Sequence, residues 1–270
     1  MSVASSLLDR HRNADGGFGP HPGQPSEPEP TALAAMALAD RDAAAWLAAA
    51  QRPEGAFGFD VGSAVNDSVT GLCALAVGPG SGREKALDYL ENAQAKQVDS
   101  SAAVPIDPSA VGWGWVGGTA SWVEPTARAL WALRVARPSS SRIADAVALL
   151  RDRGSVGGGW NYGNREVLGE ELPPYAQTTA AALIGLRRLD PNLEMQGLDS
   201  LRRLWRTEAA GGLSLAMSMA AFRIHEAPSD AEKVGLALER LVGETGLLGD
   251  GIALGWAALA ASDTLPGIVG

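Results

Sequence analysis

The sequence predicts an all-α fold, a single (α/α)6 toroid of six inner and six outer helices, from three features of the chain. A glycine-rich turn recurs six times, an amphipathic segment precedes each turn, and a segment of small apolar residues follows it. A period of roughly 35–55 residues is typical of a repeat architecture. The units run from residue 1 to 270 without a linker, so we expect one domain. The turns lie at 15–19, 54–58, 112–115, 157–160, 211–213 and 246–249.

The segments that precede the turns carry apolar residues at helical spacing along one face, which predicts helices that are buried on one side. We expect these to be the outer helices. Their predicted ranges are 2–12, 41–51, 83–96, 140–153, 194–207 and 229–242.

The segments that follow the turns are apolar on nearly all sides, a pattern typical of buried helices. Their many Ala and Gly residues allow neighbouring helices to approach closely around a common axis. The first four segments align on a threonine near their start, and the last two keep the apolar pattern without it. The predicted inner helices begin at about Glu29, Asp67, Glu124, Gln177, Leu213 and Asp250.

Three connections before inner helices are longer than usual, at 15–28, 97–121 and 154–174. Long loops at one end of a rigid scaffold are where binding residues usually lie. We therefore expect a binding site at the mouth of the inner ring.

The composition excludes several classes of protein. A net charge of −9 argues against a nucleic-acid partner and against anchoring on anionic membranes. The chain has no run of about 18 apolar residues, so no membrane span is predicted, and the N-terminus has no evident signal peptide. The single cysteine, Cys73, fits a reducing, cytoplasmic compartment, and with three dispersed histidines it predicts no zinc site. We expect no metal and no cofactor.

One outer segment carries a more specific pattern. Trp46, Gln51, Gly55 and Phe57 are spaced as aromatic-Leu-x3-Gln-x3-Gly-x-aromatic, and residues 89–94 repeat its first half. This resembles the QW repeat of squalene–hopene and oxidosqualene cyclases, whose toroid is shared by the β-subunits of protein prenyltransferases. We expect the Gln amide to bind the open end of a neighbouring helix while the aromatic ring fills the wedge between outer helices.

The resemblance also suggests where an acid would stand. In the triterpene cyclases, the proton donor is the middle acid of an Asp-x-Asp-Asp-Thr-Ala motif that opens an inner helix. Glu29 and Glu124 hold that position in the segments 27–32 and 122–127, but proline replaces the acid before the threonine. The full motif is absent, as are an Asp-Asp-x-x-Asp magnesium site and the zinc ligands of the prenyltransferases.

The mouth of the ring is predicted to be acidic. The candidate catalytic residues are Glu29, Glu124, Asp67 and Asp250, because neighbouring carboxylates in a partly apolar site raise one another's pKa toward the range of a general acid. An alternative interpretation suits each of them singly, since carboxylates also cap the free N–H groups of helix starts.

Aromatic side chains are the second group of candidates, because an aromatic face stabilises a cation. Phe18, Phe57, Trp115 and Trp160 are expected to be wedges in equivalent turns. Gln177, at the start of the fourth inner helix, and His21, on the first long loop, complete the predicted binding site. A loop histidine is more often simply exposed. The predicted pocket aromatics are Trp113, Trp122, Trp131 and Trp256.

These features predict an enzyme similar to class II terpene cyclases, an isomerase or lyase that starts the cyclisation or isomerisation of an apolar isoprenoid or polyene with a proton. A glutamate is a weaker acid than an activated Asp cluster, so an epoxide or another activated substrate suits it better than a plain alkene. Two alternatives remain open: a non-catalytic toroid that binds a lipid or a peptide, and a carbohydrate-active toroid.

Overall fold

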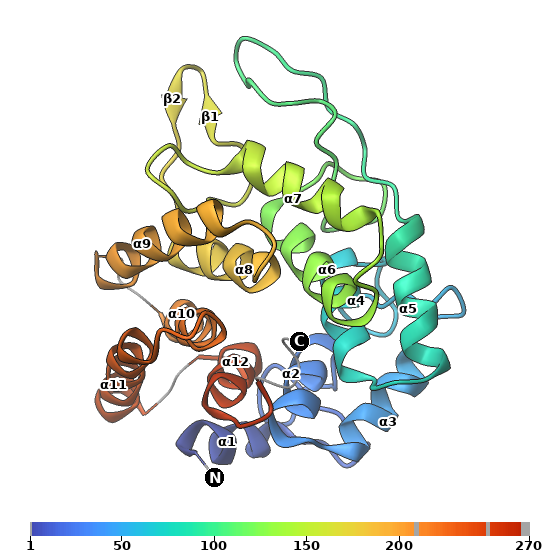
Figure 1. The fold of residues 1–270 in the computed structure, drawn as a ribbon. Coiled ribbons are helices and arrows are strands. Elements are labelled where there is room, and N and C mark those ends of the chain that lie inside the picture. The colour runs from blue at the N-terminus through green and yellow to red at the C-terminus, as the bar shows by residue number, and fades with distance from the viewer. Residues whose placement is uncertain (1, 208–210, 247–248, 266–270) are drawn as a thin grey trace.

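The computed structural model describes residues 2–207, 211–246 and 249–265, and these confirm the predicted all-α class (Figure 1). Helices from the two predicted groups alternate along the chain. The outer group comprises α1 (Val3–Leu8), α3 (Arg41–Ala50), α5 (Ser81–Asn92), α7 (Arg142–Arg153), α9 (Pro191–Thr207) and α11 (Pro228–Thr245). The inner group comprises α2 (Pro28–Leu38), α4 (Asp67–Ala76), α6 (Val123–Ala136), α8 (Ala176–Leu186), α10 (Gly212–Ile224) and α12 (Gly251–Ala261).

Most helix bounds fall within a few residues of the predicted ranges. The first outer helix is shorter than expected, because α1 ends at Leu8 and the chain continues as a 3-10 turn, η1 (Asp9–His11). The fifth begins earlier than expected, at Pro191, because proline fits the first turn of a helix.

The inner helices contact one another in a closed cycle. Each packs on the next, from α2 to α4, α6, α8, α10 and α12, and α12 packs back on α2. Glycines make two of these approaches possible. A Cβ atom on Gly185 of α8 would lie 2.6 Å from the carbonyl oxygen of Ala127 in α6, and one on Gly255 of α12 would lie 2.6 Å from the Cβ atom of Leu33 in α2. This cyclic order is the one expected of an (α/α)6 toroid.

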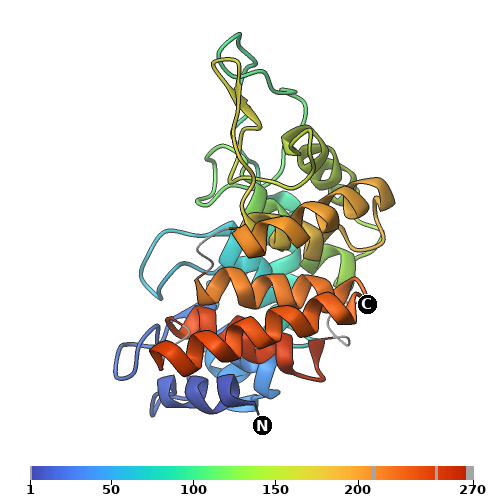
Figure 2. The ribbon, with the colours of Figure 1, turned by 90° about the vertical axis from the view of Figure 1, so that its left-hand side faces the viewer.

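The outer helices form a second layer around the inner ring (Figures 1 and 2). The helices α3, α5, α7, α9 and α11 each pack on the inner helix that precedes them in the chain, whereas α1 packs on α12. The first helix of the chain therefore completes the last unit of the ring.

A threonine hydroxyl holds each of the first four glycine turns against its inner helix. In each turn the backbone N–H of one aromatic residue donates to a threonine Oγ1 at 2.9–3.0 Å. The carbonyl of the same aromatic residue accepts from the backbone N–H of the residue before the helix. The four pairs are Phe18 with Thr31, Phe57 with Thr70, Trp113 with Thr126, and Trp160 with Thr179.

This register corrects the predicted role of one tryptophan. Trp113, and not Trp115, holds the repeated turn position. Its buried ring lies under the guanidinium of Arg142, 4.3 Å from the ring centroid, and its Nε1 donates to the carbonyl of Leu90 at 3.0 Å. Trp113 is thus a wedge beneath the outer helices and does not line the interior of the ring.

The Gln51 amide bonds to the start of the next outer helix, but to a carbonyl and not to the free N–H groups of that open end. Its Nε2 donates at 2.8 Å to the carbonyls of Gly55, in the following turn, and of Gly82, in the first turn of the next outer helix. Trp46 contacts the preceding unit, where its Nε1 donates to Asp15 at 3.0 Å. The pair therefore links three consecutive units of the outer layer.

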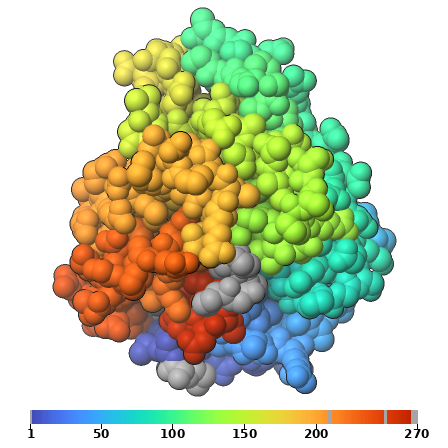
Figure 3. Space-filling view, viewed as in Figure 1, coloured from blue at the N-terminus to red at the C-terminus, as the bar shows by residue number. Residues whose placement is uncertain are grey.

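Two long loops project together beyond the helices. The 154–174 loop contains a short hairpin that the sequence did not predict, with strands β1 (Glu166–Val167) and β2 (Glu170–Glu171). The backbone N–H of Leu168 donates at 2.7 Å to the carbonyl of Ala103 in the 97–121 loop. The paired loops form the projection at the top of Figures 2 and 3. No helix in the described ranges is long and apolar enough to cross a membrane.

Candidate active site

The hydrogen bonds of the repeat place equivalent side chains at the start of four inner helices. The residue two positions before each threonine is the second residue of its helix. These residues are Glu29 of α2, Ser68 of α4, Glu124 of α6 and Gln177 of α8. The first three are buried and Gln177 is half-buried.

Two of the predicted acids meet on one arginine. The Arg128 guanidinium of α6 donates to Glu29 Oε1 through Nη1 at 2.7 Å and to Glu124 Oε1 through Nη2 at 2.6 Å. Gln177 Nε2 donates to the other oxygen of Glu124 at 3.3 Å. Neither glutamate caps its own helix, so the capping interpretation does not describe them.

Arg128 was not among the residues predicted from the sequence. It follows Glu124 by one helical turn, a spacing at which a Glu–Arg pair meets on one face. An arginine one turn after Glu124, on an inner helix whose other residues are mostly apolar, is the signal in the sequence that identifies it. Its backbone lies against α4 at Gly71, where a Cβ atom would lie 2.8 Å from the Arg128 carbonyl oxygen.

The protonation of Glu124 reflects burial and its charged neighbours. Burial raises the pKa of Glu124, and the nearby Glu29 adds to the rise; together these outweigh the lowering by Arg128 and Gln177. Burial lowers the pKa of Arg128, but its two carboxylate partners raise it further, so the guanidinium stays charged. The pair thus combines a carboxyl group that retains its proton more readily than usual with a fixed cation.

Two further polar atoms near the start of these helices have no partner in the described residues. They are the Ser68 hydroxyl and the Arg128 Nε–H, both buried. Buried polar groups are normally hydrogen-bonded, and an orphan costs roughly 1–3 kcal/mol. A polar ligand atom or a buried water is the usual remedy for such groups.

Additional acids lie beside Glu29. Partial burial raises the pKa of Glu27, and the charges of Asp60, Glu29 and Asp250 raise it further. Asp250 itself caps α12, since its Oδ1 accepts from the backbone N–H groups of Ile252 at 3.1 Å and Ala253 at 3.0 Å. The potential at this end of the ring is therefore negative, but the Asp250 carboxylate is occupied by its helix.

Asp67 is not brought to the pair. Its Oδ1 accepts from the Tyr89 hydroxyl at 2.7 Å, and its Oδ2 accepts from the backbone N–H of Gly114 at 3.3 Å. Burial raises the pKa of Asp67 despite these bonds. Because it stands one residue earlier than Ser68, it faces the outer helix α5 and the 97–121 loop.

Two of the predicted pocket tryptophans do meet inside the ring. Trp131 of α6 and Trp256 of α12 are buried and stack with centroids 6.0 Å apart and an interplanar angle of 28°. They line a gap together with Arg128 and Met217, and this gap is too narrow for a water molecule. The rings therefore fill this part of the interior, where an open aromatic-lined cavity was expected.

Solved structures of similar fold match nearly the whole length of this chain. A protein from Actinoplanes has a TM-score of 0.61 and 16% sequence identity, with 97% of this chain and 99% of that chain covered. The type II terpene cyclase MstE from Scytonema, in complex with its substrate geranylgeranyl dihydroxybenzoate, has a TM-score of 0.59 and 14% identity, with 98% and 95% covered. The same cyclase with its product merosterolic acid A has a TM-score of 0.61 and 15% identity, with 95% and 93% covered.

The fold is terpene-cyclase-like. No family model matches the chain, and no curated protein matches it.

Within this terpene-cyclase-like fold, the last two predicted binding residues lie away from the glutamate pair. Trp122 is partly exposed and lies against Gly163, beside a cavity of about 240 Å³ between the two projecting loops. His21 is exposed on the 15–28 loop. The arrangement that remains is a buried glutamate able to donate a proton, a cation and an amide that stabilise the resulting carboxylate, and two aromatic rings one turn or more further in.

Proposed function

We propose that the protein is an enzyme that starts the cyclisation or isomerisation of an apolar isoprenoid or polyene with a proton from Glu124. One observation carries the proposal: Glu29 and Glu124, from helices on either side of α4, converge on Arg128 at the start of the inner helices. The terpene-cyclase-like fold supports the choice of substrate class, because the Scytonema cyclase of this fold binds a geranylgeranyl compound.

The proton transfer follows from the contacts of Glu124. A protonated Glu124 gives its proton to an alkene carbon or an epoxide oxygen of the substrate, which leaves a cation on the substrate and a carboxylate on the enzyme. Arg128 and Gln177 already donate to the two carboxylate oxygens, so this charge forms in a prepared environment. Return of a proton from the cyclised cation to a carboxylate of the pair restores the enzyme, and the overall reaction is an isomerisation.

The stacked tryptophans have a specific part in this proposal. Their faces stabilise a cation that forms next to the pair. Because the gap beside Trp131 and Trp256 admits no water, the substrate chain has to separate the two rings in order to pass between them. An epoxide is the preferred substrate, because burial raises the pKa of Glu124 and so makes it a weaker acid, and an epoxide needs a weaker acid than a plain alkene.

The test is a product assay with purified protein. Geranylgeranyl dihydroxybenzoate and its terminal epoxide are incubated separately, and products of unchanged mass but altered retention are sought by liquid chromatography and mass spectrometry. Loss of a general acid reduces turnover by roughly 10²–10⁴-fold, which is the expectation for Glu124→Gln. Glu170→Gln, an exposed hairpin position, is the matched control. Full turnover by both Glu29→Gln and Glu124→Gln would exclude the mechanism.

A second function has its own support in the closed stack of Trp131 and Trp256. If the tryptophan stack stays closed, the acidic end of the ring serves as a non-catalytic binding site for a lipid or a peptide. Trp131→Ala and Trp256→Ala distinguish the two proposals. Opening the stack alters the rate or the product pattern of an enzyme that uses it, whereas a ligand bound only at the mouth keeps its affinity in both variants.

A further inference from the structure

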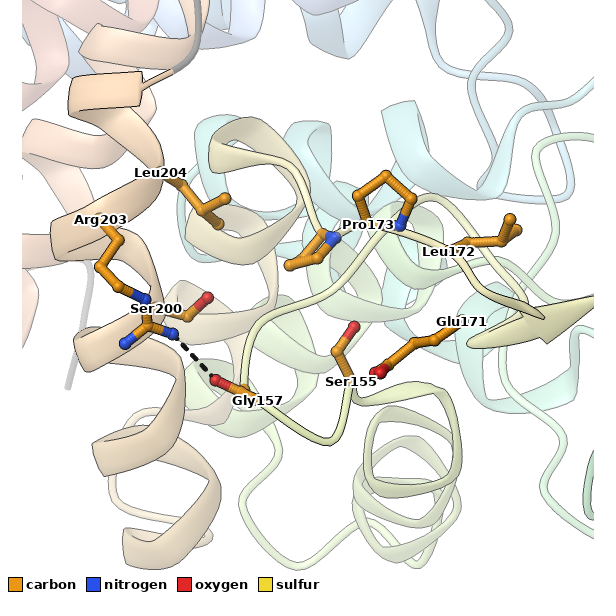
Figure 4. A pocket seen from close by; sticks show the side chains of 10 residues that line it. Ser155, Gly157, Glu171, Leu172, Pro173, Ser200, Arg203 and Leu204 are labelled. Atoms are coloured by element: carbon orange, nitrogen blue, oxygen red, sulfur yellow. Dashed lines mark hydrogen bonds between the residues drawn. The ribbon is translucent and has the colours of Figure 1, made fainter. Parts of the chain in front are cut away.

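A second pocket lies outside the inner ring, between the 154–174 loop and the outer helix α9 (Figure 4). Its volume is about 310 Å³, which falls at the lower end of the range for small-molecule sites. The polar side chains that line it are those of Ser155, Glu171, Ser200 and Arg203.

Close packing of a glycine turn on α9 shapes this pocket. Gly158 and Gly159 have φ angles of +82° and +86°, which favour glycine. A Cβ atom on Gly158 would lie 2.4 Å from the Gln196 carbonyl oxygen, and one on Gly159 would lie 2.7 Å from the Ser200 hydroxyl oxygen. The turn is therefore held in one position against the helix, and the pocket beside it is preformed.

The Ser155 hydroxyl indicates that this pocket binds a ligand. Ser155 is only 8% exposed, and its Oγ has no hydrogen-bond partner in the described residues. Figure 4 shows this hydroxyl directed into the space between Glu171 and the α9 side chains. A buried hydroxyl without a partner is unfavourable, and a polar group of a ligand in the pocket would satisfy it.

The pocket also carries two opposite charges. Arg203 Nη2 donates to the Gly157 carbonyl at 3.0 Å, and no carboxylate of the described residues lies within 4.0 Å of its guanidinium. On the other side, the Glu171 carboxylate accepts from the backbone N–H of Val156 at 2.7 Å and has no cationic partner in the same ranges. Each charged group thus keeps hydrogen-bonding capacity for a ligand.

We propose that this pocket binds a small zwitterion, an α-amino acid with an apolar side chain. Its carboxylate binds the Arg203 guanidinium and the two serine hydroxyls, and its ammonium group binds Glu171. The remaining wall, from Leu172, Pro173, Pro174 and Leu204, packs on the apolar side chain. The site is separate from the glutamate pair, so the proposal does not depend on the reaction proposed above.

Isothermal titration with L-leucine tests the proposal. Two analogues each lack one charge: 4-methylpentanoate has no ammonium group, and 3-methylbutylamine has no carboxylate. Leucine is expected to bind, and each analogue to bind at least about tenfold more weakly, because each loses a charge-assisted hydrogen bond. No saturable binding of leucine up to about 10 mM, or equal binding of an analogue, would overturn the proposal.

Matched variants locate the binding. Arg203→Met and Glu171→Gln are each expected to weaken leucine binding at least about tenfold. Arg240→Met, an exposed arginine of α11, and Glu170→Gln, the neighbour of Glu171, are expected to leave it unchanged. Glu124→Gln should also leave it unchanged, which separates a failure of this proposal from a failure of the proposed function.

Ser155→Ala provides a readout that a purely structural role would not give. Since the hydroxyl has no partner in the free protein, its removal is expected to leave the melting temperature unchanged or raise it, while the rise in melting temperature on adding leucine becomes smaller. A variant that is less stable without ligand, or that keeps the full leucine-dependent rise, would contradict the assignment.

Discussion

Arg128 on α6 reaches Glu29 on α2, two helices away around the ring, with an Nη1–Oε1 distance of 2.7 Å. The same guanidinium holds Glu124 on its own helix, so one side chain connects two inner helices that have α4 between them. The connection fixes the start of both helices in relation to each other. The two candidate acids therefore share one counter-ion, Arg128.

Removal of Arg128 is expected to be costly. Arg128→Met leaves two carboxylates buried without their cation, and breaking such a pair typically costs about 3–5 kcal/mol of the free energy of unfolding. The triple variant Arg128→Met, Glu29→Gln, Glu124→Gln removes all three charges and is expected to recover most of that loss. Urea unfolding of the wild type, of Arg128→Met, of the double variant Glu29→Gln, Glu124→Gln and of the triple variant measures this. Additive effects of the substitutions would contradict a shared ion network.

Glu124 predicts a particular pH dependence of stability. A carboxyl group whose pKa is raised in the folded state holds its proton more tightly there than in the unfolded chain. Its contribution is therefore present below the unfolded pKa of about 4.3 and is lost as pH rises through the folded pKa.

Unfolding free energies measured from below to above a pH of about 4.3 test the expectation for Glu124. The stability of the wild-type protein is expected to decline relative to Glu124→Gln as pH rises above about 4.3. Glu170→Gln is the control, and a difference between wild type and Glu124→Gln that does not change with pH would refute the prediction.

The threonine that holds each turn allows a matched pair of substitutions. Thr179→Val leaves the buried backbone N–H of Trp160 without an acceptor, at an expected cost of about 1–3 kcal/mol. Thr178 also donates to Trp160, but only to its carbonyl, which keeps the backbone N–H of Tyr175 as a donor. Thr178→Val should therefore cost less. Thermal unfolding compares them, and equal losses would contradict the proposed role of Thr179.

The Glu194 carboxylate predicts the opposite pH dependence to that of Glu124. Burial opposes its ionisation, but the contact with His225 and the backbone N–H groups of Leu189 and Asp190 hold its pKa below the usual range. Its contribution to stability is present above the unfolded pKa of about 4.3 and is lost as pH falls through the folded pKa.

Acid unfolding measures the contribution of Glu194. Glu194→Gln is expected to reduce stability at neutral pH and to make the loss of stability on acidification less steep. Glu232→Gln, an exposed position on α11, should behave as wild type. If Glu194→Gln and wild type lose stability in parallel below pH 4.3, the carboxylate does not have this role.

Much of the fold could be predicted because each type of helix has its own pattern of apolar residues. The inner helices are apolar all round and the outer helices on one face, so their order around the ring follows from the sequence. The turn register was also available, since Phe18, Phe57 and Trp113 each precede their threonine by 13 residues. The Gly-Trp-Gly-Trp segment offered two rings, and composition alone did not choose between Trp113 and Trp115.

The site was harder to predict, because one residue of register decides what an acid contacts. Glu29 and Glu124 are the second residues of their helices and point to Arg128, whereas Asp67 is a first residue and Asp250 precedes its helix. A sequence places a helix start only to within a few residues. Whether the interior is open was equally out of reach, because it depends on the rotamers of Trp131 and Trp256.

The contact between α12 and α2 gives this repeat array no free end. A linear solenoid has two terminal repeats, each with one unpaired face, and it loses structure from them step by step. In a closed ring every repeat has two neighbours, so the first unit to unfold has to give up two interfaces at once. Because α1 belongs to the last unit, we infer that unfolding is a single cooperative event. Detachment of either α1 or α12 weakens the contacts that join the last unit of the ring to the first.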